Sequence, residues 1–303
     1  MSKKDDFGFV AVQLTRKMWM GNTQLLPEDV KADAELLEGK YKDIVKLGTK
    51  KLYPKSWQDL FLSIYGRARY IIKSNSLPFI TEHIRAVPKE GLSRLIERLE
   101  LVKTEWNEAK ERFKAHYEGI KNEMEKTYPD LWLRMSHLYP DVSTLNDKFD
   151  LDWAIYEVKS ASCSPTSAPE VQAAYDKAKK QLNEKLQTMV EESVVYLRNR
   201  VVQAVKTLRD RLNSGKIVRN DTIESVRNVH DWFNELNIFG DKTVEESLKA
   251  LRQAMNGMDS ESLKDNDALA KTLTELADKV AADAENLEDL NYLTGNFRRT
   301  LEI

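Results

Sequence analysis

The sequence has few of the residues on which most catalytic and metal sites depend. It contains one cysteine, four histidines, 11 glycines and 8 prolines in 303 residues. The single cysteine, Cys163, excludes an internal disulfide framework and a cysteine-rich zinc site. A Gly-rich phosphate loop, a Gly-x-Ser-x-Gly motif and a His-Glu-x-x-His motif are all absent from the sequence. We therefore predict a non-enzymatic protein with no catalytic, cofactor-binding or metal-binding residues.

Long hydrophobic runs are also missing. No segment approaches the roughly 18 consecutive apolar residues that a membrane-spanning helix needs. The charged start, MSKKDDFGF, has no apolar stretch of signal-peptide length behind it. We expect a cytoplasmic protein that has no membrane contact and no small-molecule substrate.

A few residues could still carry chemistry, and each has a simpler interpretation. His116 falls on the apolar seam of a predicted helix, where a histidine usually packs as a core residue. Cys163 lies in a Ser/Pro-rich loop with no histidine nearby in sequence, which is typical of an incidental exposed thiol. Asp150 and Asp152 would point to one side of a strand and could bind a metal or act as acid and base. The core-like Leu151 between them indicates a solvent-facing pair instead.

Amphipathic helix is what the sequence has in abundance. Two very long helices are predicted, over Pro88–Lys126 and Pro169–Lys216, because apolar residues recur at steps of three and four. The seam of the first consists of Leu95, Leu99, Val102, Trp106, Ala109, Phe113, His116, Ile120 and Met124. The seam of the second consists of Val171, Tyr175, Ala178, Leu182, Leu186, Met189, Val194, Leu197, Val201, Val205, Leu208 and Leu212, with irregular steps between Leu182 and Leu197.

Two segments of the sequence are predicted to form strands. Phe7–Met20 is rich in residues that favour strands, and Phe149–Tyr156 alternates with period two. A lone strand cannot satisfy its backbone groups, so we expect these two to pair with each other. The first long helix is then an insertion between two strands.

Shorter helices and a loop are predicted around these elements. Helices are expected over Pro27–Leu37, Pro54–Ser74 and Asp130–Leu138, and a basic loop over Gly39–Lys51. In the C-terminal part, Asp221 with Glu224 and Thr243 with Glu246 resemble capping boxes that begin two helices. A third helix is expected over approximately Leu263–Leu287.

The predicted fold class is mainly α: an elongated helical bundle or coiled-coil hairpin with a small two-stranded β element at its base. We divide the chain into an N-terminal strand and basic helical region (1–87), a long helical hairpin with a short β segment near 149–158 (88–216), and an acidic helical region (217–303). Irregular seam spacing in the second long helix argues against a regular supercoil.

Charge is distributed unevenly along the chain. Residues 1–80 contain 14 basic and 9 acidic side chains, whereas residues 221–303 contain 9 basic and 18 acidic ones. Between Lys40 and Lys73, aromatic side chains alternate with basic ones, so this region could bind DNA or RNA through phosphates and unpaired bases. An acidic region of a protein partner would fit the same side chains equally well. The candidate binding residues are Lys46, Lys50, Lys51, Lys55, Arg67, Arg69 and Lys73.

Four short motifs resemble an uncharacterised bacterial and phage family that is known only as a domain of unknown function. They are Met18-Trp19-Met20-Gly21, Leu26-Pro27-Glu28-Asp29, Leu47-Gly48-Thr49-Lys50-Lys51 and Phe149-Asp150-Leu151-Asp152-Trp153. The resemblance covers roughly the first 160 residues. Members of that family tend to be encoded on phages and mobile elements, near MoxR-type AAA+ ATPases and von Willebrand A-type proteins. The resemblance therefore implies an accessory or adaptor role beside such an ATPase, and it supplies no catalytic residues.

Two functions remain open at this point. The first is a helical adaptor that acts through protein–protein contacts, with an AAA+ ATPase or as a homo-oligomer, because long amphipathic helices need apolar cover along their length. The second is a DNA- or RNA-binding accessory protein that uses the basic aromatic region 40–73.

Overall fold

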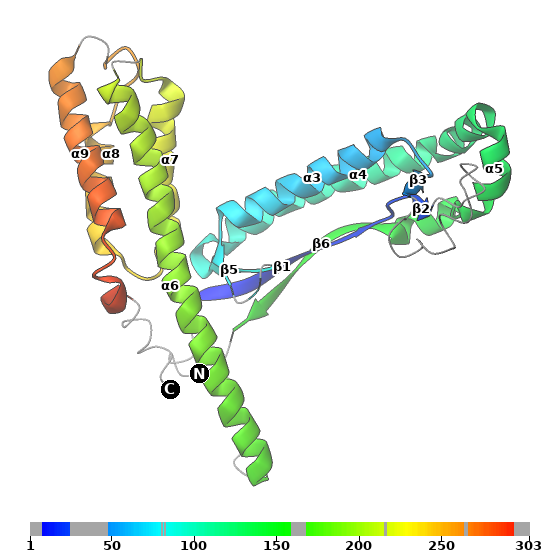
Figure 1. Ribbon diagram of the computed structural model, residues 1–303, viewed down its shortest axis with the longest axis horizontal. Helices are drawn as coiled ribbons and strands as arrows, with labels where there is room; N and C mark the ends of the chain where they lie inside the picture. Colours follow the sequence, from blue (N-terminus) through cyan, green and yellow to red (C-terminus); the bar gives the residue numbers. More distant parts are fainter. Residues whose placement is uncertain are drawn as a thin grey trace, which may run out of the picture. The chain divides into compact units, whose positions relative to one another are not determined.

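The computed structural model describes residues 8–24, 48–79, 81, 83–158, 168–214, 217–263 and 266–293. Within these ranges the protein is mainly helical and contains two small antiparallel sheets (Figure 1). The chain divides into two compact units, and several elements run from one into the other. Unit 1 comprises the described parts of Met1–Gln13, Ile72–Leu95 and Ile155–Ile303, and unit 2 comprises those of Leu14–Ile71 and Ile96–Ala154. The expected three-part division of the sequence stays a prediction.

The larger sheet has four strands in the order β4-β5-β1-β6. Their bounds are β1 Phe9–Met18, β4 Leu77–Pro78, β5 Ile84–Pro88 and β6 Phe149–Glu157. Strand β1 is antiparallel to β5, with register from Phe9↔Pro88 to Gln13↔Ile84, and β5 is antiparallel to β4. The predicted pairing of the first strand with the strand after residue 149 is confirmed. The expectation of only two strands is wrong, because β4 and β5 are too short to show a strand period in the sequence.

A second sheet includes the end of the segment that we expected to be a loop. Strand β2 (Asn22–Gln24) pairs antiparallel with β3 (Thr49–Lys51), and Asn22 lies opposite Lys51. The basic end of the expected Gly39–Lys51 loop is therefore a strand. The expected helix over Pro27–Leu37 lies outside the described residues.

Helix α4 (Lys89–Thr127) has almost the predicted bounds of the first long helix. Its buried seam consists of Leu95, Leu99, Val102, Trp106, Ala109, Phe113, Tyr117 and Ile120. His116 is exposed, so its prediction as a seam residue is wrong. The seam takes a step of four from Phe113 to Tyr117, because a period of 3.6 residues allows either three or four.

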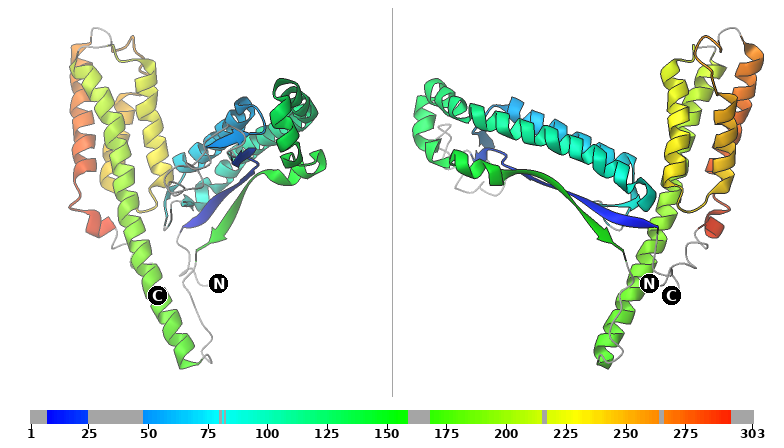
Figure 2. Two further views of the ribbon diagram at one scale, coloured as in Figure 1. Left: turned by 45° about the vertical axis from the view of Figure 1, so that its right-hand side comes forward. Right: turned by 180° about the vertical axis from the view of Figure 1, so that it is seen from behind.

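The core of unit 2 is a cluster of aromatic rings. Helix α3 (Lys55–Ser74) lies beside α4 on one face of β1 and β6 (Figures 1 and 2). The Phe61 ring stacks on Phe149 of β6 at 4.6 Å between centroids and meets Trp106 of α4 edge-on at 4.9 Å. Phe113 lies 5.3 Å from Phe149. Each such pair contributes about 0.5–1.5 kcal/mol beyond the burial of its surface, so these rings join the strand to both helices.

The core of unit 1 is a bundle of four helices around α6 (Pro169–Asn213). The others are α7 (Asn220–Leu236), α8 (Lys242–Ala254) and α9 (Asp267–Glu285). The continuous buried part of the α6 seam begins at Leu186, whereas Val171 and Tyr175 are exposed. Figure 1 shows that this first part of α6 extends past the other three helices. An elongated hairpin made of α4 and α6 stays a prediction.

Two of the predicted helix starts in the bundle use different residues from those expected. The residue before α7 is Arg219, which makes no side-chain cap, so the capping box at Asp221 is wrong. Helix α8 is capped by Asp241, whose Oδ1 accepts a hydrogen bond from Val244 N at 3.2 Å, and not by Thr243. The third helix begins after Asn266, whose side chain caps Leu269 N.

Among the described helices, none combines the length and apolar character that crossing a membrane requires. This finding covers the described residues alone.

Candidate functional site

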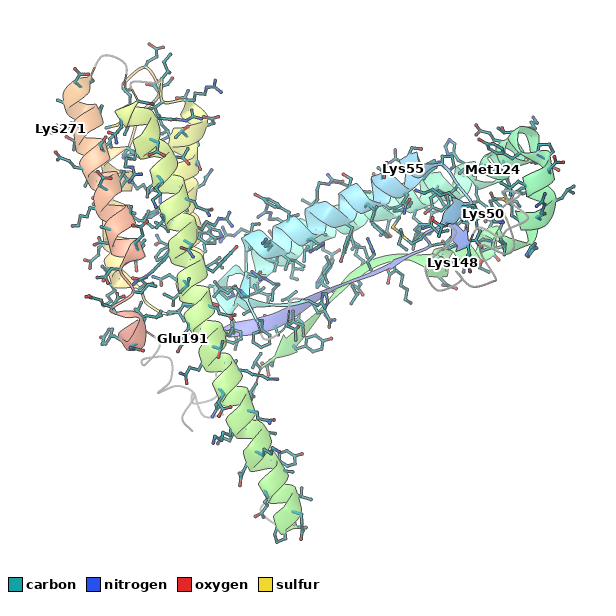
Figure 3. All side chains as sticks on the ribbon, in the orientation of Figure 1. Lys50, Lys55, Met124, Lys148, Glu191 and Lys271 are labelled. Carbon is teal, nitrogen blue, oxygen red and sulfur yellow. The ribbon has the colours of Figure 1, made fainter. Side chains whose placement is uncertain are left out.

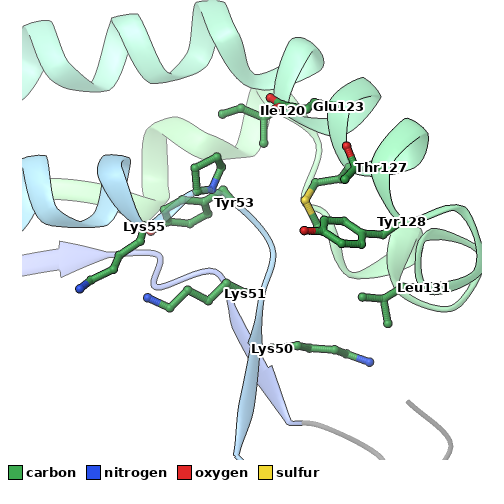
Figure 4. A pocket seen from close by; sticks show the side chains of 11 residues that line it. Lys50, Lys51, Tyr53, Lys55, Ile120, Glu123, Thr127, Tyr128 and Leu131 are labelled. Atoms are coloured by element: carbon green, nitrogen blue, oxygen red, sulfur yellow. The ribbon is translucent and has the colours of Figure 1, made fainter. Parts of the chain in front are cut away.

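A hollow of about 460 Å³ in unit 2 brings predicted basic residues together with apolar side chains. Its basic side is formed by Lys50 and Lys51 of β3 and by Lys55 at the start of α3. Its opposite side comes from the end of α4 and from α5 (Pro129–Met135) (Figure 3). The lining residues are Lys50, Lys51, Tyr53, Pro54, Lys55, Ile120, Glu123, Met124, Thr127, Tyr128 and Leu131 (Figure 4). We call this hollow the lysine pocket.

The three lysines are placed by the pairing of β3 with β2 and by the short connection from β3 into α3. Lys51 Nζ donates a hydrogen bond to Oε1 of the buried Gln58 at 2.6 Å, which fixes the lysine stem beside the first turns of α3. Lys55 is 73% exposed and lies 4.0 Å from Asp59, a separation at which solvent screens most of the attraction. Figure 4 shows Lys51 and Lys55 directed the same way and Lys50 extending toward the side of Leu131. Positive charge therefore borders the pocket on two sides.

Close packing of Gly21 against Tyr53 fixes the backbone on the lysine side of the pocket. Gly21 has φ +55°, and a Cβ at this position would overlap the Tyr53 ring. Leu52 N donates to Gly21 O at 2.6 Å, and Tyr53 Oη donates to Trp19 O at 2.7 Å. Burial raises the pKa of the Tyr53 phenol to about 12. The ring is therefore a neutral, fixed part of the pocket base throughout the physiological pH range.

The apolar side of the pocket is set by the end of α4. Pro129 cannot continue the helix hydrogen bonding, so the chain turns at Tyr128 and starts α5. This turn leaves the Tyr128 side chain 53% exposed at the pocket, next to the half-buried Met124. Earlier in α4, Tyr117 Oη donates a hydrogen bond to Pro140 O at 2.9 Å, which anchors α4 to the segment after α5.

Chemically, the lysine pocket suits a ligand that is both anionic and apolar. Pockets of a few hundred cubic ångströms, with apolar walls and a few charged groups, are typical of specific binding sites. Among the described residues that line the pocket, Glu123 is the one acidic side chain. The described residues contain no cluster of three or more histidine, cysteine, aspartate or glutamate side chains that could hold a metal ion.

Of the remaining predicted basic residues, the described ones, Arg67, Arg69 and Lys73, lie outside the pocket lining. Lys46 is outside the described residues. Arg67 forms an ion pair with Glu105 of α4, and the Arg69 guanidinium lies 5.9 Å from the Tyr65 ring. Lys73 is in the last turn of α3. At about 1.5 Å per residue, Arg67 is roughly 18 Å along the helix from Lys55, so the structure brings together only part of the predicted set.

The other candidate residues that the structure describes make packing and ion-pair contacts. His116 lies against Trp57, with 5.6 Å between ring centroids. Asp150 and Asp152 are exposed, as the alternation of β6 predicts. Lys103 Nζ donates to Asp152 Oδ1 at 3.0 Å, and this hydrogen bond is the main cause of a lowered pKa for Asp152. Cys163 is outside the described residues.

Only half of the lysine pocket is visible in the sequence. The lysines are visible as a charge cluster, but Ile120, Met124, Tyr128 and Leu131 lie far away in sequence. One local signal was present: Tyr128 directly precedes Pro129, where a long helix has to end.

Comparison with known proteins identifies the family. Residues 8–274 match the family described as "Protein of unknown function (DUF3150)", so the chain belongs to this family. The match extends well beyond the first 160 residues that the motifs suggested and includes most of the four-helix bundle. No curated protein and no solved structure matches the chain.

Proposed function

We propose that this protein is a helical adaptor that acts through protein–protein contacts, and that the lysine pocket is a docking site for an acidic segment of a partner. The observation that carries the proposal is the pocket itself. It places three lysines around a hollow of about 460 Å³ whose other walls include Ile120, Met124 and Leu131. An acidic chain with one apolar side chain would use both kinds of wall at once.

The partner class follows from the family resemblance. Members of the resembled family tend to be encoded near AAA+ ATPases on phages and mobile elements, which makes such an ATPase, or a second copy of this chain, the expected partner. The scarcity of catalytic motifs in the sequence agrees with an adaptor.

A nucleic-acid-binding accessory protein is the second candidate, because Tyr128 is exposed beside the three lysines and could stack on an unpaired base. Two observations make it the weaker one. A strand of nucleic acid needs a basic track along its backbone, but Arg67 is already paired with Glu105. The concave, partly apolar walls also suit a side chain better than a phosphate backbone.

A binding measurement with defined probes separates the two candidates. The first probe is a fluorescent peptide with four glutamates around a central leucine and tyrosine; the second has serine in place of both apolar residues. The third is a single-stranded DNA oligonucleotide. Fluorescence anisotropy should show the strongest binding for the first peptide. Substituting Lys51→Glu together with Lys55→Glu should weaken that binding by roughly tenfold or more, since two favourable charge contacts become repulsive.

The matched control is Lys177→Glu with Lys180→Glu. Both residues are exposed on α6 and outside the pocket, and the change in net charge is the same. Retained peptide binding in the control supports a site-specific effect. Equal binding of the serine peptide, or equal loss in both variants, would contradict the docking site. DNA binding stronger than peptide binding at physiological salt would establish the nucleic-acid alternative in its place.

A further inference from the structure

We propose that the lysine pocket receives the acidic segment 283–292 of a second copy of this chain, so that the protein associates head to tail. The inference rests on the proposed docking function and names the partner of the same site.

Segment 283–292 is acidic and carries exposed apolar side chains. No lysine or arginine occurs between Lys279 and Arg298, whereas this interval contains Asp283, Glu285, Glu288 and Asp289. Leu287 is 48% exposed and Tyr292 is 69% exposed, although both are large apolar side chains. The combination of local negative charge with exposed leucine and tyrosine is the ligand chemistry that the lysine pocket suits.

The bundle holds this segment in a fixed shape. Arg198 of α6 is 1% exposed, and its guanidinium donates to Asp289 Oδ2 at 2.9 Å and to the carbonyl oxygen of Asn286. Asn286 Oδ1 accepts a hydrogen bond from Glu288 N at 2.9 Å, and Leu293 is buried in the bundle core. Because the backbone is held on both sides of Leu287, little conformational entropy has to be lost when the segment binds.

The acidic side chains of the segment differ in the ion pairs that they form within the chain. Asp289 is used internally by Arg198, and Glu285 Oε1 accepts from Lys206 Nζ at 2.6 Å in an exposed pair. Glu288 is exposed and follows Leu287 directly. An exposed ion pair is worth little, so Glu285 can exchange Lys206 for a lysine of the partner at small cost. Leu287, Glu288 and Glu285 are thus presented together.

The match between the two surfaces is electrostatic and apolar. Leu287 has apolar walls to meet at Ile120, Met124 and Leu131, while Glu285 and Glu288 have Lys51 and Lys55 as charge partners. Pocket and segment are different surfaces of one chain. The charged residues that would make the contact, Lys51, Lys55, Glu285 and Glu288, are exposed, as is Leu287. In the pocket wall Met124 and Leu131 are half-buried and Ile120 is buried, so Leu287 would meet mainly the first two. A contact between different surfaces of two copies is heterologous, and it builds an open chain or a ring rather than a two-fold dimer.

The test uses sedimentation velocity on the full chain. The pocket variant carries Lys51→Glu and Lys55→Glu, and the segment variant carries Leu287→Ser and Glu288→Lys. We expect the average sedimentation coefficient of the wild type to rise with concentration. Each variant alone should sediment as a monomer at the same concentrations. An equimolar mixture of the two should form a heterodimer and nothing larger, because only one competent pocket and one competent segment remain in each pair.

Each outcome bears on the proposal. A wild type that stays monomeric at all concentrations, or variants that still assemble alone, overturn it. Lys177→Glu with Lys180→Glu should assemble like the wild type; loss there would point to net charge and overturn the site assignment. Circular dichroism of both variants checks that they are folded. Binding of the leucine–tyrosine peptide is measured separately, so a monomeric wild type that binds this peptide contradicts self-association and leaves the docking function intact.

Discussion

At the scale of single residues, Gly21 is the position where the backbone constraint is clearest. A residue with a side chain would have to adopt φ +55° and would also overlap the Tyr53 ring. We predict that Gly21→Ala lowers the free energy of unfolding by about 1–2 kcal/mol from the backbone alone, with more from displacement of Tyr53. Urea denaturation followed by circular dichroism measures this.

Gly66 provides the matched control for Gly21. It lies in the middle of α3, and a Cβ there would meet nothing within 4 Å. Gly66→Ala should leave stability unchanged or raise it by about 0.5–1 kcal/mol, because alanine favours helix. Equal destabilisation by both substitutions would contradict the role given to Gly21.

The buried tyrosines predict an alkaline limit to stability. Burial raises the pKa of Tyr53 and of Tyr139 from 10.0 to about 12, and that of Tyr117 is raised by burial and by the neighbouring Tyr139. The folded state therefore holds these protons more tightly than the unfolded state does. Stability is fully present below pH 10 and is lost as the pH rises from 10 toward 12.

The measurement is the apparent unfolding midpoint as a function of pH, together with tyrosinate absorbance. Tyr53→Phe removes the hydrogen bond to Trp19 O and should lower stability at neutral pH by about 1 kcal/mol. It should also make the loss above pH 10 less steep. An unchanged alkaline slope would contradict the assignment of Tyr53 to this group of late-titrating phenols.

At the scale of helices and strands, the fold is predictable where the apolar period is long. Helices α4 and α6 follow from many repeats of one spacing, and the β1–β6 pairing follows because each strand needs a partner. Short elements cannot be predicted in this way, because β4 and β5 contain too few residues to show a period. The lysine pocket is only half predictable. The local charge cluster reveals Lys50, Lys51 and Lys55, but the apolar walls come from residues that only the tertiary fold brings close.

The helix caps show a second limit of the sequence. Asp241 and Thr243 are both good candidates for starting α8, and local spacing favoured Thr243 through its Glu246. In the structure Asp241 is 2% exposed and accepts from Arg198 Nε at 2.7 Å as well as from Val244 N. A partner 43 residues away in sequence thus fixes where the helix begins, and no local pattern contains that information.

Arg198 therefore organises three elements of the bundle, and its removal should be costly. Its hydrogen bonds join α6 to the start of α8 and to the segment after α9. Burial by itself lowers the pKa of Arg198, but the hydrogen bonds to Asp289 and Asp241 raise it overall. Because Arg198→Met leaves the buried Asp241 carboxylate without its cation, we predict a loss of about 3–5 kcal/mol in the free energy of unfolding.

Arg209→Met on the same helix is the control for Arg198→Met. Arg209 pairs with Asp210 and Asp278, whose side chains are both more than half exposed. Little change in stability is expected, since water replaces the lost contacts. If denaturation midpoints showed similar losses for both variants, buried charge pairing would not explain the effect of Arg198.

At the scale of the whole molecule, the uneven charge along the chain leads to a testable prediction about self-association. The basic excess of residues 1–80 includes the three lysines of the pocket, and the acidic excess of residues 221–303 includes segment 283–292. If complementary charge governs their contact, inverting both sides together should restore it. We therefore predict that one chain with Lys51→Glu, Lys55→Glu, Glu285→Lys and Glu288→Lys self-associates in sedimentation velocity, whereas a chain with either pair alone does not.

This charge swap separates the effect of charge complementarity between the two surfaces from a change in net charge. The four changes leave the net charge as it was, and the exposed Glu285–Lys206 pair that is lost contributes little to stability. Added salt should weaken assembly of the wild type and the swapped chain alike, because the Debye length is about 10 Å at 0.1 M. A mixture of wild type and swapped chain should not form mixed assemblies, since each pocket then faces a segment of its own charge. Rescue in the swapped chain together with this mutual exclusion would require a contact between these two surfaces, whereas a swapped chain that stays monomeric would rule it out.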